Sequence, residues 1–302
     1  MTRLLSVQSE IGNHKNFDTY KRVIQMQPKA SENDFLGRFR EIVSDPLNLI
    51  IQRDPRAGFV DGDLVYLHNG LRVPIAGSYA YYGDFSEILV INRGVHEPVE
   101  EFVFQEVLKH LSDSPLMIEL GAYWGHYSMW IKSVYPDANV HLVEPELQNL
   151  SVGKNNFELN GFTGEFINAF VGKGHFGVDR YLAEQGIQKV TILHSDIQGY
   201  EVEMLEDCSK SLTSKAVDYL FVSTHSQQLH LDAVSILQGF GYRVEVTSDF
   251  DYETTSCDGF IFASSPLVEP IFTEFNPISR VQIPEANPEY LVDYLLNTLL
   301  VN

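Results

Sequence analysis

The chain has 302 residues, of which 44% are hydrophobic and 12% aromatic, so it is long enough to bury a large core in one domain or two. Its formal net charge is −20, from 41 acidic and 21 basic residues, and no cluster of Lys and Arg forms a basic stripe. This balance argues against nucleic acid and anionic membranes as partners, because both attract basic surfaces.

Three further absences narrow the class of protein. No run of 18 or more apolar residues occurs, and the first eight residues are too short and polar for a signal peptide. We therefore expect a cytoplasmic protein with no membrane insertion. Cys208 and Cys257 form no metal or redox pattern, and a structural disulfide is not expected in that compartment.

Residues 1–94 are predicted to form an accessory region that begins with an arm and a helix. Residues 1–27 have weak periodicity and are interpreted as an arm that packs on a partner subunit or at the substrate mouth. Residues 31–34 resemble a capping box with Asp34 in place of Glu or Gln, and apolar residues follow at helical spacing as far as Asp45. The pattern predicts one helix that starts at the box.

Short β-prone runs follow between residues 60 and 92. The runs at 64–68 and 88–91, with Gly-containing turns at 61–63 and 69–70, favour a small antiparallel unit. The aromatic cluster at 79–85 lies between these runs, and we interpret it as core or turn residues, with a sugar or polyketide site as the alternative.

The stretch 116–128 carries the strongest functional signal. An apolar run over 116–120 predicts the central strand of a parallel sheet, and Gly121 and Gly125 mark a loop before a helix. Glu119 stands where a dinucleotide fingerprint has its first glycine, and its carboxylate would repel a pyrophosphate. The pattern favours a cationic ligand, S-adenosylmethionine (SAM), and the alternative is a turn that binds nothing.

A second acid follows the next predicted strand, 139–143. Glu144 precedes Pro145, which cannot continue a strand ladder, and lies 144 − 119 = 25 positions after Glu119. This separation resembles nucleotide-binding βαβ units, in which an acid about 20 residues on binds the ribose hydroxyls. Glu144 is therefore predicted to bind a ribose, with a solvated loop glutamate as the alternative.

Predicted strands and helices alternate along the rest of the chain. Further strands are predicted over 164–171, 190–194, 219–223, 242–246 and 260–263, and helices over 95–111, 146–159, 178–185, 199–210 and 229–240. This alternation specifies a mostly parallel sheet with helices on both faces. The last two strands have no helix between them, which predicts an antiparallel hairpin at one edge. We expect an α/β, Rossmann-like sheet of seven strands with an antiparallel edge strand.

Three segments in this order resemble the FkbM family of SAM-dependent O-methyltransferases. They are Glu-Leu-Gly-Ala-Tyr-Trp-Gly-His-Tyr-Ser at 119–128, Val-Glu-Pro at 143–145 with Asn156 and Asn160 downstream, and Asp-Ile-Gln-Gly-Tyr-Glu-Val-Glu-Met-Leu at 196–205. The resemblance covers roughly residues 95–264. It implies a class I methyltransferase that methylates a hydroxyl of a natural product, a sugar or a polysaccharide.

The resemblance also implies a cofactor site. Glu119, Gly121 and Glu144 would contact SAM. The predicted site further includes Ala122, Tyr123, Gly125, Ser128, Pro145, Asn168 and Asp196. The chain departs from the family at the fourth strand, where it has His194-Ser195-Asp196 in place of the usual Lys-Ile/Val-Asp.

Catalytic candidates lie after the fourth and fifth predicted strands, because ligands bind beyond the carboxyl ends of parallel strands. An alcohol acceptor must lose its proton to a base or to a metal-bound group. We predict Asp196 and His225 as catalytic residues, and His194, two positions before Asp196, as a second candidate base. The alternatives are a structural role for His225 and a helix cap near Gly199 for Asp196.

A divalent metal is the less favoured route to the same chemistry. Its oxygen ligands would come from Asp196, Glu201 and either Asp249 or Asp251, although no contiguous motif requires a metal.

The C-terminal residues 265–302 are predicted to form a tail that ends in a helix. Asn287 is the expected N-cap and Pro288 the first helical residue. The apolar stripe consists of Leu291, Tyr294, Leu295 and Leu299. This face would be buried on its own domain, on a second subunit or as a lid, and homodimerisation is the favoured explanation. The predicted division is therefore 1–94, 95–264 and 265–302.

Three functions remain open. The favoured one is an O-methyltransferase that acts on a small molecule or carbohydrate. An N- or C-methyltransferase is weakened, because no Asn/Asp-Pro-Pro-Tyr stretch follows the fourth strand. The third is a SAM-binding fold with a structural or interaction role.

Overall fold

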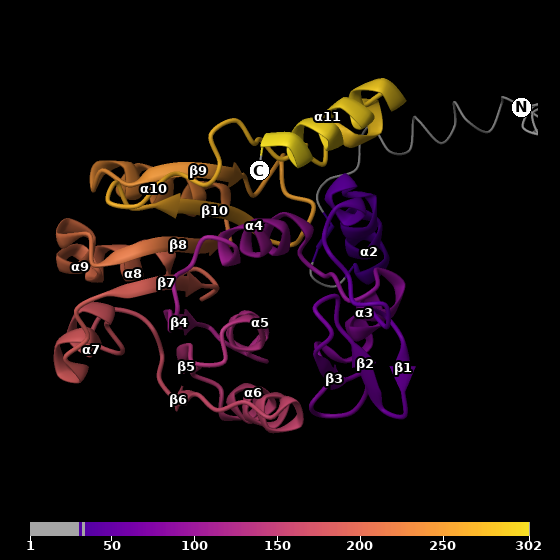
Figure 1. Cartoon of the computed structure of the whole chain (residues 1–302). Coiled ribbons are helices and arrows are strands. Elements are labelled where there is room, and N and C mark those ends of the chain that lie inside the picture. Colours follow the sequence, from indigo (N-terminus) through magenta and orange to yellow (C-terminus); the bar gives the residue numbers. More distant parts are fainter. Residues whose placement is uncertain (1–29, 32–33, 302) are drawn as a thin grey trace, which may run out of the picture.

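The computed structural model describes residues 30–31 and 34–301 (Figure 1). The arm predicted over 1–27 lies outside the described residues. The described residues form two units. The larger is a seven-stranded sheet with helices on both of its faces, and the smaller, beside it, contains a three-stranded sheet.

The large sheet has the strand order β6-β5-β4-β7-β8-β10-β9. Its strands are β4 Leu116–Leu120, β5 Asn139–Val143, β6 Glu165–Ile167, β7 Val190–Ser195, β8 Val217–Thr224, β9 Arg243–Ser248 and β10 Gly259–Ser264. All neighbouring pairs are parallel except those of β10, which runs antiparallel to both β8 and β9. This topology confirms the Rossmann-like class I methyltransferase fold and the hairpin at one edge. Within the hairpin, the reversed strand is β10, and the outermost strand is β9.

Helices cover both faces of this sheet (Figure 1). One face carries α4 Pro98–Leu108, α5 His126–Val134 and α6 Leu147–Asn160, and the other carries α7 Val178–Gln185, α8 Glu201–Asp207, α9 Ser209–Ser214 and α10 Gln227–Gly239. The helix predicted over 199–210 is thus two short helices that meet at Cys208. Gly161 and Gly186 end α6 and α7 in the left-handed conformation, which is common for a glycine after a helix.

The accessory unit contains α2 Phe35–Ser44, η1 Pro46–Leu49, β1 Val60–Asp61, β2 Leu64–Tyr66, β3 Arg72–Pro74, η2 Gly83–Glu87 and α3 Ile88–Ile91. The antiparallel unit is confirmed by β1, β2 and β3. The β-prone reading of residues 88–91 was wrong, because they form α3, in which Ile88 and Leu89 are buried while Ile91 is 55% exposed. The helix was predicted to start at the capping box over 31–34. The last residue of that box, Asp34, is instead the N-cap of α2, and its side chain accepts the Gly37 N–H at 2.9 Å.

One continuous hydrophobic core crosses the three predicted regions. It joins Val65 and Phe85 of the accessory unit, Phe102 of α4, and Phe272 and Phe275 of the C-terminal segment. The C-terminal segment then continues through η3 Ile283–Glu285 to α11 Pro288–Val301, which confirms the predicted terminal helix. The accessory unit and the C-terminal segment are therefore packed into the same body as the large sheet.

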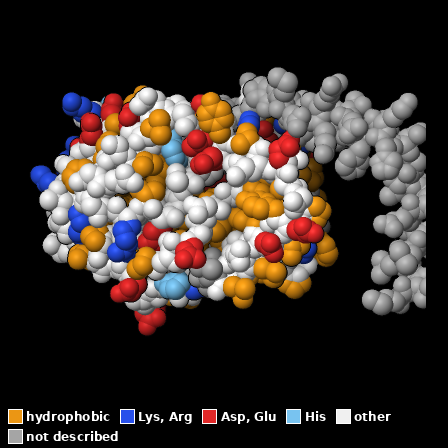
Figure 2. Space-filling model, turned by 90° about the horizontal axis from the view of Figure 1, so that it is seen from above, with side chains coloured by type: hydrophobic (Ala, Val, Ile, Leu, Met, Phe, Trp, Pro, Cys, Tyr) orange, Lys and Arg blue, Asp and Glu red, His pale blue; other side chains and the backbone are white. Residues whose placement is uncertain are grey.

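The surface view bears on the expected partners. On the face shown in Figure 2, acidic side chains are scattered and Lys and Arg side chains do not gather into a continuous patch. Among the described residues, no helix has both the length and the apolar character needed to cross a bilayer. The absence of a nucleic-acid partner and the cytoplasmic location stay predictions.

Candidate functional site

A cavity of about 320 Å³ lies at the carboxyl ends of β4, β5 and β7. The strand order reverses between β4 and β7, because β5 and β6 lie on one side of β4 and β7 and β8 on the other. Strand β4 lies between β5 and β7, so the loops after β4 and β7 leave opposite sides of one crevice, the usual ligand position in such sheets. Seven of the ten residues predicted for the cofactor line this cavity: Glu119, Gly121, Ala122, Tyr123, Glu144, Pro145 and Asp196.

Gly121 shapes the floor of the cavity. It has φ +72°, and a Cβ at this position would lie 1.7 Å from the backbone oxygen of Asp196. The loop after β4 can therefore cross the loop after β7 only without a side chain here. The N–H groups of Gly121 and Ala122 donate to the Val143 carbonyl, at 2.9 and 3.1 Å, which ties the loop to β5.

The Glu144 carboxylate is oriented by its neighbours. It accepts the backbone N–H groups of Tyr123, at 3.1 Å, and of Glu146, at 3.0 Å, and it is buried at the cavity wall. Burial raises the pKa of Glu144, and these N–H groups oppose the rise. A carboxylate has about four acceptor positions, so Glu144 keeps capacity for a ligand.

Glu119 has a second, structural partner. Its Oε2 accepts the Ser128 N–H at 3.1 Å, near the start of α5, and its side chain is also buried at the cavity. Burial raises the pKa of Glu119 as well. Glu119 thus stabilises the first turn of α5 and offers its remaining lone pairs to the cavity.

Three residues predicted to contact the cofactor do not line the cavity. Gly125 is the N-cap of α5 and has φ +73°. Ser128 is fully buried and holds Glu119 through its backbone. Asn168 donates to the carbonyls of Glu144, at 2.9 Å, and Pro145, at 2.7 Å. All three position cavity residues from behind, a role that motif resemblance does not separate from direct contact.

A second cavity, of about 430 Å³, adjoins the first. The two share Tyr81, Tyr82, Glu97, Asp196 and Gln198, and the second adds Phe35, Arg38, His225, Cys257 and Asp258. Phe35 and Arg38 come from α2, so the accessory unit builds one wall. Within the aromatic cluster at 79–85, Tyr81 is buried and Tyr82 is 48% exposed, and both line the two cavities. A sugar or polyketide site at this cluster stays a prediction.

His225 and Asp196, the two residues predicted to be catalytic, both line the second cavity and lie next to each other. His225 Nε2 lies 3.2 Å from Asp196 Oδ1 and 3.5 Å from Asp258 Oδ1, and Nδ1 lies 2.7 Å from Glu201 Oε1. Although burial opposes it, these carboxylates raise the pKa of His225 to about 11. An imidazole that keeps its proton has no lone pair for a substrate proton, so this geometry argues against the base role predicted for His225.

The local geometry bears on two of the alternatives predicted for Asp196, a helix cap and a metal ligand. Helix α8 begins at Glu201 after Tyr200, and no side chain caps it, so the capping role was wrong. Of the oxygens considered for a metal, Asp249 holds a turn through the N–H groups of Tyr252 and Glu253, and Asp251 is exposed. Besides Asp196, the carboxylate that faces His225 Nε2 is that of Asp258, which precedes β10 and carried no signal in the sequence.

His194 is also tied to a carboxylate. Its Nε2 lies 2.5 Å from Glu100 Oε1, and Glu100 Oε2 accepts the Ser223 hydroxyl at 3.0 Å. Burial lowers the pKa of His194 and raises that of Glu100, which is consistent with a neutral pair that shares one proton. Strand β7 ends at Ser195, so His194 lies in the strand and Asp196 beyond it.

Glu97 is the site residue that the sequence reasoning missed most clearly. It lines both cavities, and its Oε2 accepts the Tyr127 hydroxyl at 2.9 Å. Burial, together with the nearby Glu100, Asp196 and Asp258, raises the pKa of Glu97 to about 8, against the opposing charge of His96. Its position just before Pro98 of a predicted helix gave no indication of this environment.

Comparisons with known proteins add little to this geometry. No family model and no curated protein sequence matches the chain. A precorrin-6y C5,15-methyltransferase from Geobacter metallireducens GS-15 is 15% identical over 55% of this chain and 86% of that chain, with a TM-score of 0.39. TrmK from M. capricolum, in complex with S-adenosyl-homocysteine, is 14% identical over 66% and 83%, with a TM-score of 0.40.

Methyltransferase FkbM from Methylobacillus flagellatus KT is 14% identical over 76% of this chain, with a TM-score of 0.39, and the match spans only 58% of that chain. Likeness at this level does not indicate what the present chain binds or acts on. Strand order and strand direction define the fold, and the two cavities carry the evidence for function.

Proposed function

We propose that this chain is a SAM-dependent methyltransferase that transfers a methyl group to a hydroxyl of a small molecule or carbohydrate. The observation that carries the proposal is the junction of two cavities across Tyr81, Tyr82, Glu97, Asp196 and Gln198. The first cavity has the carboxylates and the glycine approach of a nucleoside site, and the second has room for an acceptor. Methyl transfer needs two ligands held in line across such a junction.

The first cavity fits SAM by its donor and acceptor set. Glu144 would accept hydrogen bonds from the ribose hydroxyls, and Glu119 would face the cationic end, where a phosphate would be repelled. When bound, SAM supplies an activated methyl group on a sulfonium. The residues of the chain then have to orient the acceptor, exclude water and remove the hydroxyl proton.

Glu97 is the proposed proton acceptor. It lies at the junction, it is held by Tyr127, and its pKa of about 8 makes it a stronger base than an ordinary glutamate. Asp196, oriented by the charged His225, would hold the acceptor hydroxyl beside it. This assignment keeps Asp196 and His225 in the site, but moves the base role from His225 to Glu97.

The lining of the second cavity favours a carbohydrate-like acceptor. Phe35, Tyr81 and Tyr82 offer aromatic faces, while Asp196, Gln198 and Asp258 offer polar groups to hydroxyls. Large aromatic surfaces combined with a few oriented polar groups suit a ring that has both apolar faces and hydroxyl edges.

An amine acceptor is the second candidate, and one observation favours it. Three carboxylates, Glu97, Asp196 and Asp258, line the second cavity, against the basic groups of Arg38 and His225. A cationic amine would be attracted there, and Glu97 could remove its proton before transfer.

Transfer of radiolabelled methyl groups from SAM to matched acceptor panels tests the proposal. One panel contains sugars, nucleotide sugars and polyols, and the other contains amino sugars and amines of similar size. We expect label in hydroxyl acceptors, and loss of most of it in Glu97→Gln, while Glu158→Gln on the exposed side of α6 keeps the wild-type rate. Label only in the amine panel would establish N-methylation instead. No transfer to either panel by a protein that binds SAM would contradict the enzymatic proposal.

A further inference from the structure

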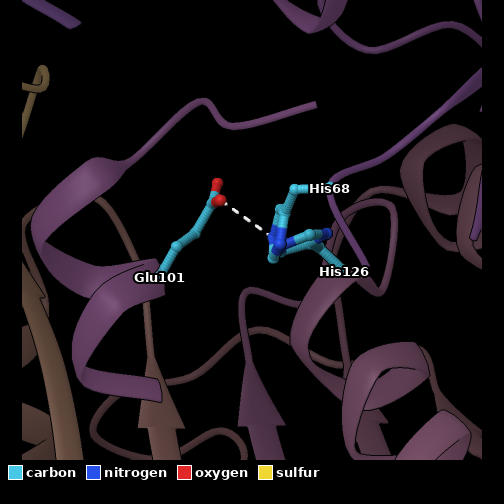
Figure 3. A group of neighbouring side chains, drawn as sticks. All are labelled: His68, Glu101 and His126. Carbon is cyan, nitrogen blue, oxygen red and sulfur yellow. Dashed lines mark ion pairs between the residues drawn. The ribbon is translucent and has the colours of Figure 1, made fainter. Parts of the chain in front are cut away.

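A second polar cluster lies where the accessory unit meets helices α4 and α5. It consists of His68, which follows β2, Glu101 of α4 and His126, the first residue of α5 (Figure 3). The residues are 1%, 0% and 1% exposed. Three titratable side chains from three separate elements are thus removed from water at one point.

The three side chains converge on a common point. One ligand atom from each lies within 4.8 Å of the others, and in Figure 3 both imidazole rings lie on the same side of the Glu101 carboxylate. His68 Nε2 lies 2.9 Å from Glu101 Oε2, so these two atoms are ion-pair partners.

His126 is the most informative member. Both of its ring nitrogens are buried and have no hydrogen-bond partner among residues 30–31 and 34–301. Buried polar side chains nearly always have a partner, and an exception requires an explanation such as an ion. An ion pair between His68 and Glu101 would explain those two residues, but it would leave both nitrogens of His126 unexplained.

The carboxylate is held in place from its other side. Glu101 Oε1 accepts the backbone N–H groups of His96, at 2.9 Å, and Glu97, at 3.1 Å, and lies 2.5 Å from His96 Nδ1. Outer hydrogen bonds of this kind orient the ligands of protein metal sites. Gly94 lets the segment before α4 pass close to the backbone of His68. It has φ +85°, and a Cβ there would lie 2.1 Å from the His68 backbone nitrogen.

We propose that His68, Glu101 and His126 bind one divalent transition-metal ion, for which Zn²⁺ is the best fit. Two imidazole nitrogens and one carboxylate oxygen form a ligand set that zinc accepts, whereas Mg²⁺ and Ca²⁺ prefer oxygen ligands. The ion would join the loop after β2 to α4 and α5, and so fix the accessory unit, which builds the acceptor wall, against the cofactor loop. This site is separate from the proposed methyl transfer and does not depend on it.

Zinc content per chain is the direct test. Wild-type protein and variants are loaded with excess Zn²⁺, dialysed against a weak chelator, and measured by mass spectrometry of the metal, with circular dichroism to confirm folding. We expect about one zinc per chain in the wild type, and at least a tenfold loss in Glu101→Gln and His126→Gln. His141→Gln alters a histidine that pairs with Tyr181 outside the cluster, and should keep the zinc.

Two further measurements cover the other outcomes. Asp258→Asn alters the cluster around His225, and it should also retain zinc; loss of zinc there alone would place the metal at that cluster and overturn the proposal. If the His126 and Glu101 variants do not fold, cobalt added to metal-free wild type should give the visible bands of a four-coordinate site, with water as the fourth ligand, and removal of the metal should lower the melting temperature. Folded wild type that retains no zinc, gives no such bands and keeps its melting temperature would contradict the proposal.

Discussion

At the scale of single residues, Gly121 has the strictest requirement in the candidate site. It has a positive φ, and the backbone oxygen of Asp196 lies 1.7 Å from the position that a Cβ would take. Gly161 has a similar φ of +74°, but a Cβ there would meet nothing within 4 Å. The two glycines therefore separate the effect of backbone conformation from that of close approach.

Gly121→Ala should destabilise the protein far more than Gly161→Ala. The control change should cost about 1 kcal/mol, from the left-handed conformation alone, and Gly121→Ala about 3 kcal/mol or more, because the crossing of two loops must open. Chemical denaturation of both variants measures the difference. Equal losses would show that the loops do not cross as described.

The pH dependence of stability tests the environment of Glu97. Its pKa in the folded state is raised from 4.5 to about 8, so the folded state holds a proton that the unfolded chain releases earlier. The stability from this group is complete below pH 4.5 and is lost as the pH rises to about 8. Glu97→Gln should lose less stability than the wild type across that window, while Glu158→Gln should follow the wild type. Parallel curves for Glu97→Gln and the wild type would contradict the raised pKa.

The residues that could be predicted were those whose signals are local. Glu119 and Glu144 line the cavity as expected, because Glu119 lies at the end of an apolar run two positions before Gly121, and Glu144 lies between a strand and Pro145. Glu97 and Asp258 join the site from distant parts of the chain, and their environment depends on packing that no spacing encodes. Ser128 and Asn168 were assigned to the ligand because a motif does not distinguish a residue that touches a ligand from one that holds its neighbour.

At the scale of elements, α11 has two different sides. Tyr294 packs against the core, and its hydroxyl accepts the Ile278 N–H at 3.4 Å, whereas Val292, Leu296 and Leu299 are about half exposed, at 54%, 50% and 57%. Of the predicted stripe, Leu299 thus points away from the core. The exposed side keeps open the expectation that the helix joins an oligomer or a lid.

Removal of the tail at Ile283 should leave SAM affinity unchanged and abolish oligomer or lid formation. The reason is that the tail does not line the cofactor cavity, while it carries the exposed apolar side of α11. Light scattering gives the mass, and Val292→Glu/Leu299→Glu is the matched variant that keeps the packed side. An unchanged mass and full turnover in both would show that the tail has neither role.

Element types were predictable where the periodic pattern was long. The strands and helices of the large sheet were found in the right order, because apolar runs alternate with amphipathic stretches. Residues 88–91 are a run of four apolar residues, too short for its period to separate strand from helix, and packing of Ile88 and Leu89 decided for α3.

At the scale of the whole molecule, the accessory unit and the sheet together build the second cavity. Arg38 of α2 lines this cavity and lies 3.9 Å above the ring of Phe85, but it does not line the first. Arg38→Ala should therefore raise the KM for the acceptor about tenfold and leave the Kd for SAM unchanged, and Arg180→Ala, on the far face, should alter neither. A loss of SAM affinity in Arg38→Ala would show that the two cavities do not have separate ligands.

SAM binding through Glu144, in the cavity at the ends of β4 and β5, underlies the proposed methyl transfer. Isothermal titration calorimetry of the wild type, Glu144→Gln and the exposed control Glu158→Gln tests it most directly. A charge-assisted hydrogen bond contributes about 1.5–3 kcal/mol, so Glu144→Gln should bind SAM at least tenfold more weakly than the wild type, while Glu158→Gln binds equally well. Unchanged SAM affinity in folded Glu144→Gln, or wild-type protein that binds NADH and not SAM, would contradict the proposed role of Glu144 and of this cavity.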